Sequence, residues 1–346
     1  MTLFNPNDIG QPNGHYFALP YSLDEAMLAL ISVPWDVTTS FRPGTAGAPQ
    51  SIIGASAQVD LFDEDVAEAW TIKIGTAPFS ARLEEENRKY RAIAEKIIAA
   101  LAQGIVSDKL TDKTAKINTA CEAMNQYVYR EARNQLAAQR IPAIVGGEHS
   151  VPFGLLRALS EQYEAFGILH IDAHADLRKA YEGFTYSHAS IMYNALQLPA
   201  LQRLTQVAVR DYCHDESLLM QNDKRIITFL DSHWQEEAFH GKTWAAHTDE
   251  IVQSLPHHVY ISFDIDGLTP DCCPNTGTPV PGGLSYPQAV YLLKQVAQSG
   301  RRIIGFDLCE TSANANDANL AARLLYKLCC YTYLANRNHT KENNNN

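Results

Sequence analysis

The chain has 346 residues, 46% hydrophobic and 19% charged, a balance that excludes a disordered protein. Its formal net charge is -11 and no run of Lys or Arg occurs, so a nucleic-acid partner is excluded and a small cationic ligand is favoured. No apolar stretch approaches the roughly 20 residues that cross a bilayer, and residues 1–16 lack the pattern of a secretory signal. We therefore expect a cytoplasmic protein with no membrane partner.

Short apolar runs alternate with segments of helical periodicity along the whole chain. The runs predict strands at 28–33, 71–75, 143–145, 167–171, 206–209, 226–229, 259–263 and 303–306. The intervening periodic segments predict helices at 83–102, 116–140, 152–163, 215–221, 244–254, 286–300 and 317–334. This alternation predicts an α/β fold with a parallel sheet covered on both faces. We expect one domain over 1–346, with a polar N-terminal arm at 1–25 and a disordered tail at about 338–346.

Charged residues follow two of the predicted strands at regular spacing. Asp172, His174 and Asp176 come directly after 167–171, and Asp264 and Asp266 follow 259–263. Ligands bind at the carboxyl ends of parallel strands, so these side chains are placed where a site is expected. The carboxylates could instead serve as caps, ion-pair partners or an exposed Asp-Gly turn. Two desolvated aspartates so close together would repel each other, however, which favours a bound cation.

A third strand, 143–145, leads into two glycines, Glu148 and His149. His149 alone would more often be a packing or capping residue, but three strand ends with ligand-type residues favour a metal. Oxygen donors mixed with imidazole suit manganese, iron, nickel or zinc better than calcium. The donors are too many for one open catalytic zinc, and two ions roughly 3.5–4 Å apart could share and activate one water.

These motifs resemble the signatures of the ureohydrolase family, which includes arginases and agmatinases. The resemblance rests on Gly146–Ser150, Asp172–Asp176 and Ser262–Asp266, and it extends over roughly residues 27–335. It implies a three-layer α/β/α fold with an eight-stranded parallel sheet, and assembly as a homo-oligomeric trimer or hexamer. It also implies two divalent ions, Ni²⁺ or Mn²⁺, and hydrolysis of a small cationic guanidino substrate that releases urea.

The resemblance assigns roles residue by residue. The implied metal ligands are His149, Asp172, His174, Asp176, Asp264 and Asp266. His188 would bind substrate and shuttle a proton to the departing nitrogen, and Glu310 would hold the guanidinium. Asp176 would also steady the tetrahedral intermediate. For His188 an exposed loop histidine, and for Glu310 a helix-capping carboxylate, remain alternatives.

Several positions depart from the family pattern. Glu148 and Thr269 stand where members often have Asp, Asn275 stands where they often have Gly, and Ala189 replaces a usual glycine. The residues with which arginases grip an amino-acid head group are not evident in 179–187, so arginine is a poor candidate substrate.

Other segments suggest which branch of the family is nearest. Residues 32–38, 58–63 and 177–190 look most like an agmatinase-like branch that includes nickel-dependent guanidine hydrolases. The aromatic residues that could close a small pocket, or equally pack within loops, are Trp35, Tyr181, Phe184 and Tyr186. We expect free guanidine as substrate, with agmatine or a guanidino acid as alternatives.

Two other classes of function compete with this interpretation. A deacetylase-like amidohydrolase on the same fold would use one zinc and a histidine pair, and no such pair occurs near 140–150. A non-catalytic, ureohydrolase-like regulatory subunit would be expected to have lost ligands, whereas all six are present.

Overall fold

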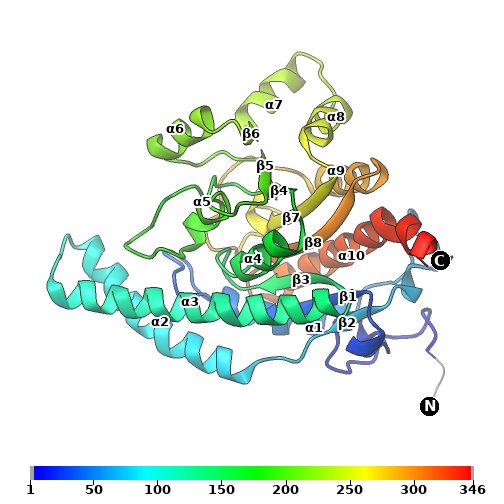
Figure 1. Ribbon diagram of the computed structural model, residues 1–346, viewed down its shortest axis with the longest axis horizontal. Coiled ribbons are helices and arrows are strands. Elements are labelled where there is room, and N and C mark those ends of the chain that lie inside the picture. The colour runs from blue at the N-terminus through cyan, green and yellow to red at the C-terminus, as the bar shows by residue number, and fades with distance from the viewer. Residues whose placement is uncertain (1–3, 344–346) are drawn as a thin grey trace.

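The chain folds around one eight-stranded sheet in which every strand pair is parallel (Figure 1). The computed structural model describes the backbone of residues 4–343 and the side chains of 4–337. The strands are β1 (Leu28–Val33), β2 (Ile74–Thr76), β3 (Ile141–Gly146), β4 (Phe166–Ile171), β5 (Leu201–Val207), β6 (Ile226–Phe229), β7 (His258–Asp264) and β8 (Arg302–Cys309). Their order across the sheet is β2-β1-β3-β8-β7-β4-β5-β6. The predicted parallel α/β sheet is therefore confirmed.

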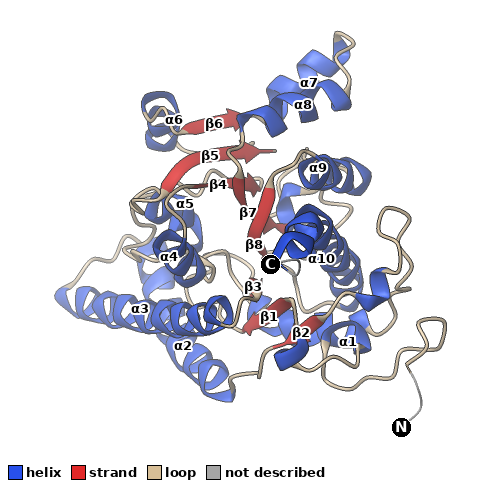
Figure 2. Cartoon of the chain, turned by 45° about the vertical axis from the view of Figure 1, so that its right-hand side comes forward, coloured by secondary structure: helices blue, strands red, loops and turns tan. Residues whose placement is uncertain are grey.

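Helices cover both faces of this sheet and give three layers (Figure 2). On one face lie α2 (Ala81–Ala102), α3 (Asp108–Ala137), α4 (Phe153–Gln162), α5 (Ile191–Ala195) and α6 (His214–Asn222). On the other lie α1 (Ala48–Ser56), α7 (Asp231–Phe239), α8 (Trp244–Ser254), α9 (Tyr286–Gln298) and α10 (Ala315–Asn343). Each face has its own apolar core, because the central strands are buried on both sides.

Some element boundaries differ from the sequence expectation for local reasons. The strand expected at 206–209 is β5, which begins at Leu201 and ends at Val207, because Ala208 takes a left-handed φ of 74°. Helices α1, α5 and α7 were not predicted. The five residues of α5 are too few to show a helical period, and α1 contains both a proline and a glycine.

The two ends of the chain are tied to this core to different extents. Tyr16, Phe17 and Leu19 of the N-terminal arm are buried, and the Tyr16 hydroxyl lies 2.8 Å from Ser32 Oγ on β1. The tail expected to be disordered, 338–346, overlaps the end of α10, which continues to Asn343. Residues 344–346 lie outside the described part of the chain.

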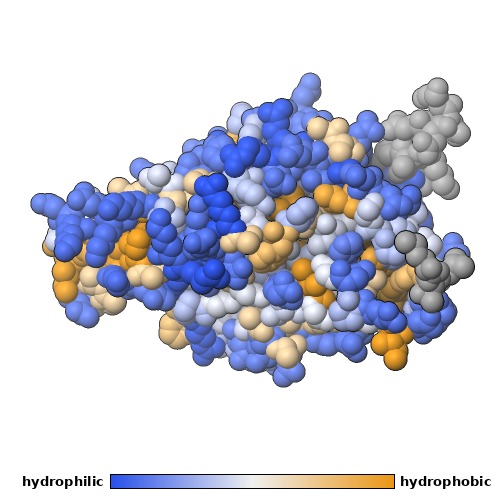
Figure 3. Space-filling view, turned by 90° about the horizontal axis from the view of Figure 1, so that it is seen from below, coloured by the Kyte–Doolittle hydropathy of each residue, from blue (hydrophilic) through white to orange (hydrophobic). Residues whose placement is uncertain are grey.

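The surface view in Figure 3 is mainly hydrophilic, with an apolar patch at its left end and smaller apolar patches elsewhere. The last turn of α2 exposes Leu101, and the connection to α3 exposes Ile105 and Val106. Within residues 4–343, every helix is too short or too polar to span a bilayer.

Candidate metal centre and active site

The residues predicted to do chemistry follow four strands that are neighbours in the middle of the sheet. In the order β3, β8, β7 and β4, the strands are followed or ended by His149, Glu310, Asp264 and Asp172. Because all eight strands run in parallel, their carboxyl ends meet at one edge. The sheet thus brings together residues up to 161 positions apart in sequence, as in the hydrogen bond from His149 N to Glu310 Oε1.

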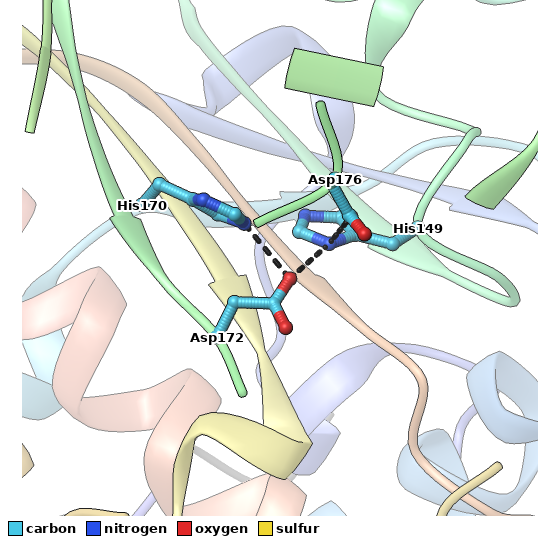
Figure 4. A group of neighbouring side chains, drawn as sticks. All are labelled: His149, His170, Asp172 and Asp176. Atoms are coloured by element: carbon cyan, nitrogen blue, oxygen red, sulfur yellow. Dashed lines mark hydrogen bonds and ion pairs between the residues drawn. The ribbon is translucent and has the colours of Figure 1, made fainter. Parts of the chain in front are cut away.

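A first group of donors surrounds the imidazole of His149. Its Nδ1 lies 3.0 Å from Asp172 Oδ2, 3.2 Å from Asp176 Oδ2 and 3.4 Å from Asp264 Oδ2. All four side chains are almost completely buried. Figure 4 shows Asp172 and Asp176 pointing toward the His149 ring.

A second group lies on the other side of Asp172. His174 Nδ1 is 3.4 Å from Asp172 Oδ1 and 3.3 Å from Asp266 Oδ2. The two oxygens of one carboxylate therefore face two different donor groups. Among the described residues, two clusters have ligand atoms close enough to hold a metal ion: His149, His170, Asp172 and Asp176 form one, and Asp172, His174 and Asp266 form the other. The arrangement fits metal binding, since carboxylates and imidazoles converge and, among the described residues, no Arg or Lys forms an ion pair with these carboxylates; the nearby Arg210 instead donates to the backbone oxygen of Asp266.

The pKa values of these groups show that burial and mutual repulsion disfavour the charged carboxylates. Burial, together with the Asp266 and Asp172 carboxylates, raises the pKa of Asp264 well above its ordinary value. Burial and Asp172 raise the pKa of Asp176 to about 6. Burial alone would lower the pKa of His149, but the surrounding aspartates outweigh it and raise that pKa well above its ordinary value. Divalent cations would relieve this repulsion by taking the place of protons.

Comparison with known proteins agrees with this geometry, because a model described as the Arginase family matches residues 26–334. The chain belongs to the arginase family. It is 32% identical over 311 residues to the N(1)-aminopropylagmatine ureohydrolase of Thermus thermophilus, covering 89% of this chain and 90% of that protein. It is 28% identical to the guanidinobutyrase of Pseudomonas aeruginosa, covering 90% of this chain and 88% of that protein.

Solved structures show the same fold. The agmatine ureohydrolase of Thermoplasma volcanium superposes with a TM-score of 0.70 at 23% identity, covering 96% of this chain and 97% of that one. The proclavaminate amidino hydrolase of Streptomyces clavuligerus gives 0.71 at 22% identity, covering 93% and 97%. The resemblance seen in the sequence is confirmed, and this arginase-family protein is a hydrolase acting on guanidino C–N bonds.

Residues behind the first donor group fix the tautomer of His149. Ser262 Oγ donates to Asp307 Oδ2 at 2.8 Å, so it can only accept from His149 Nε2, which lies 2.8 Å away. Asp307 is buried and also accepts from the Tyr260 hydroxyl and from Phe263 N. With Nε2 protonated, Nδ1 is the nitrogen left to bind a metal.

His170 was not assigned a role from the sequence, although it belongs to the metal-sized cluster with His149, Asp172 and Asp176. Gln206 Nε2 donates to His170 Nδ1 at 3.0 Å, so His170 Nε2 carries the proton and donates to Asp172 Oδ2 at 2.8 Å (Figure 4). Both ring nitrogens are therefore occupied by hydrogen bonds. His170 orients Asp172 and is not placed as a ligand. Its position on β4, two residues before Asp172, is the signal that could have identified it, because residues two apart in extended chain point to the same side.

Asp176 and Glu310 share a left-handed backbone, with φ of 54° and 60°. Such strain in non-glycine residues is costly and clusters at functional sites. Glu310 N donates to Gly147 O and its Oε1 accepts from His149 N, both at 2.8 Å. A side chain at Gly277 would come within 3.4 Å of Glu310 Oε2, so the glycine leaves space beside that oxygen.

His188 begins a short 3-10 helix, His188–Ser190, across from these strand ends. Its N donates to Thr38 Oγ1 at 3.1 Å, its Nε2 lies 3.4 Å from Ser40 Oγ, and Tyr181 packs edge-on against its ring. Its enclosed position and the nearby His174 lower the pKa of His188 to about 3, so its imidazole is neutral at neutral pH.

The four aromatic residues that could close a pocket differ in burial and in the residues they contact. Trp35 and Phe184 are fully buried and pack in the core, and Tyr186 packs against Phe153. Tyr181 packs edge-on against the ring of His188, a predicted catalytic residue.

Proposed function

We propose that this arginase-family protein hydrolyses free guanidine to urea and ammonia, using two divalent ions, Ni²⁺ or Mn²⁺. The six residues proposed to hold the ions are His149, Asp172, His174, Asp176, Asp264 and Asp266. When bound, such ions would supply a water activated at neutral pH. The convergence of all six candidate ligands speaks against a non-catalytic regulatory subunit, and the second donor group speaks against a single-zinc deacetylase-like enzyme.

The observation that carries the choice of substrate is the enclosure of the reacting groups. Asp172, Asp264, Asp266 and Glu310 are at most 5% exposed, and Tyr181 packs against His188. A substrate with no tail fits this enclosure best, because all of its atoms can be held among these groups.

The chain's own residues then have separate tasks in the reaction. Glu310 would accept N–H groups of the guanidinium and fix the carbon in position, as a carboxylate does in a bidentate pair. Asp176 would steady the tetrahedral intermediate. Neutral His188 would take a proton from the attacking water and deliver it to the departing nitrogen, which leaves as ammonia.

A guanidino acid is a second candidate because two arginines lie near residues that contact His188. Arg42 is exposed two residues beyond Ser40, its backbone oxygen lies near Gly277, and its guanidinium lies over the Phe41 ring. Arg178 lies over the Tyr181 ring. Arg178 forms an ion pair with Glu216 at 3.7 Å, which offsets its charge. The exposed Arg42 beside Ser40 is therefore the cation that would disfavour the charged tail of agmatine and attract a carboxylate tail.

The test is urea release by purified protein reconstituted separately with Ni²⁺ and Mn²⁺. The substrates are guanidine, 4-guanidinobutyrate, agmatine and arginine, and we expect kcat/KM to be at least about tenfold higher for guanidine. A preference for 4-guanidinobutyrate would select the second candidate, and a preference for agmatine would reject the proposal. The expected trimer or hexamer and the cytoplasmic location remain predictions.

A further inference from the structure

The turn after β3, residues 147–149, contacts Glu310 and the segment that follows β1. Gly147 O accepts from Glu310 N, and His149 N donates to Glu310 Oε1, both at 2.8 Å. Between them, Glu148 sends its side chain toward a different part of the molecule, the segment after β1. One turn thus links a candidate metal ligand, the candidate guanidinium acceptor and, through Glu148, a third region.

The Glu148 carboxylate is fully buried and accepts four hydrogen bonds. Thr38 N and Ser150 Oγ donate at 2.7 and 2.6 Å, and the Thr38 and Thr39 hydroxyls donate at 2.8 and 3.3 Å. No cation is paired with it among the described residues. Such a buried carboxylate is held in one place by its donors, and it holds them in return.

The hydroxyl of Thr38 connects this carboxylate to His188. Its single proton is given to Glu148 Oε1, so its oxygen lone pairs are turned away from Glu148, and one of them accepts from His188 N at 3.1 Å. Thr39 donates to the same carboxylate, but within the described part of the chain the backbone N of His188 is bonded to Thr38 and not to Thr39. The two neighbouring threonines therefore differ in the one contact that matters for His188.

We propose that Glu148 is a positioning residue for His188 and acts through the hydroxyl of Thr38. The proposal rests on the proton-shuttling role proposed above for His188. It also gives a physical meaning to a departure from the family pattern, in which aspartate often takes this position. Aspartate is shorter by one methylene, about 1.5 Å, so it could not hold Thr38 by both oxygens from the same backbone position.

The first experiment compares Thr38→Val with Thr39→Val, which make the same change on adjacent residues. Both are measured with whichever guanidino compound the wild-type protein turns over best. We expect Thr38→Val to lower kcat about 10- to 100-fold with KM within about threefold, because a misplaced group costs rate rather than binding. Thr39→Val and Thr38→Ser should keep kcat within about threefold, and all three should keep wild-type metal content. Equal losses in the two valine variants would overturn the proposal.

The second experiment asks whether Thr38 acts through His188. In a His188→Asn background, Thr38→Val and Glu148→Gln should change kcat by less than about threefold, although each lowers kcat in the wild-type background. Full additivity would show that they act elsewhere and would overturn the inference alone. A fully active His188→Asn variant would overturn the proposed role of His188 as well, and this would be visible in the single variant.

A third measurement is independent of turnover and of any folding defect in Glu148→Gln. Crystal structures of Thr38→Val and Thr39→Val should show the 187–190 backbone displaced in the first and unchanged in the second. An unmoved His188 in Thr38→Val would overturn the inference even if no substrate were found.

Discussion

The strand-end side of the site and its loop side are built in different ways. On the strand-end side, Asp172, Asp264 and Glu310 follow neighbouring parallel strands, and the sheet alone brings them together. On the loop side, His188 is placed by a hydrogen bond to Thr38, 150 residues away, and by contacts with Ser40 and Tyr181. The strand ends gather charge, whereas the loop orients a neutral imidazole. Substitutions on the strand-end side should therefore remove the metals. Substitutions on the loop side should slow the reaction with the metals still bound.

The largest effect is expected on the strand-end side, from Asp172→Asn. In the wild type, Asp172 Oδ2 faces the donor group of His149 and Asp172 Oδ1 faces the donor group of His174. The substitution therefore weakens both candidate metal positions at once. We expect metal content below half of the wild-type value and a loss of activity on the order of 10⁴-fold. Elemental analysis after gel filtration and a urea assay measure the two effects. Full metal content in this variant would contradict the placement of Asp172 between the two donor groups.

His188→Asn tests the loop side directly. We expect kcat to fall roughly 10²- to 10³-fold, because a positioned acid–base group contributes a factor of this size. Metal content should stay at the wild-type level, since His188 is in neither donor group. A loss of metal would remove the distinction between the two sides, and an unchanged kcat would remove His188 from the chemistry.

A smaller effect is expected from His170→Ala, which removes the residue that orients Asp172. Outer-shell partners of this kind typically contribute 10- to 100-fold to metal affinity, so a shift of about that size is expected in a metal titration. The exposed His233 on α7 offers a matched control, and His233→Ala should bind metal like the wild type. Equal affinities in the two variants would show that Asp172 needs no support from His170.

The same contrast explains which parts of the protein could be predicted from sequence. The eight strands and most long helices are visible as local periodicity, and the ligands are visible because residues such as Asp264 and Asp266 lie beside a strand in the chain. The supports of the site are not local. Hydrogen bonds join Ser262 with Asp307, Gln206 with His170, and Glu148 with Thr38, residues that lie 36 to 110 positions apart, and no spacing rule identifies such pairs. Short or atypical helices such as α5 and α1 also escape, because they lack a full helical period.

The smallest expected effect is on the pH dependence of stability, which tests the charged groups of the strand-end side. The folded-state pKa values of Asp176, about 6, and of Asp264 are raised above their ordinary values. Such groups stabilise the metal-free fold fully below the ordinary pKa of 3.8 and lose that contribution as pH rises through the folded-state value. The pKa values of His149 and His174 are also raised, so their contribution is lost above their ordinary value of 6.5.

The contribution of Asp172 to stability has the opposite pH dependence. Burial would raise its pKa, but His170, His149 and His174 outweigh burial and lower that pKa well below 3.8. Its contribution is lost only in acid below that value. Between pH 5.5 and 8.5 the metal-free protein should therefore become less stable, while metal binding tightens because fewer protons must be displaced. We expect the Tm difference between metal-loaded and EDTA-treated protein to be larger at pH 8.5 by roughly 5 °C. A Tm difference independent of pH would mean that the ions do not replace protons at these strand ends. The His188→Asn variant, which is altered only on the loop side, is the control and should show the wild-type pH dependence.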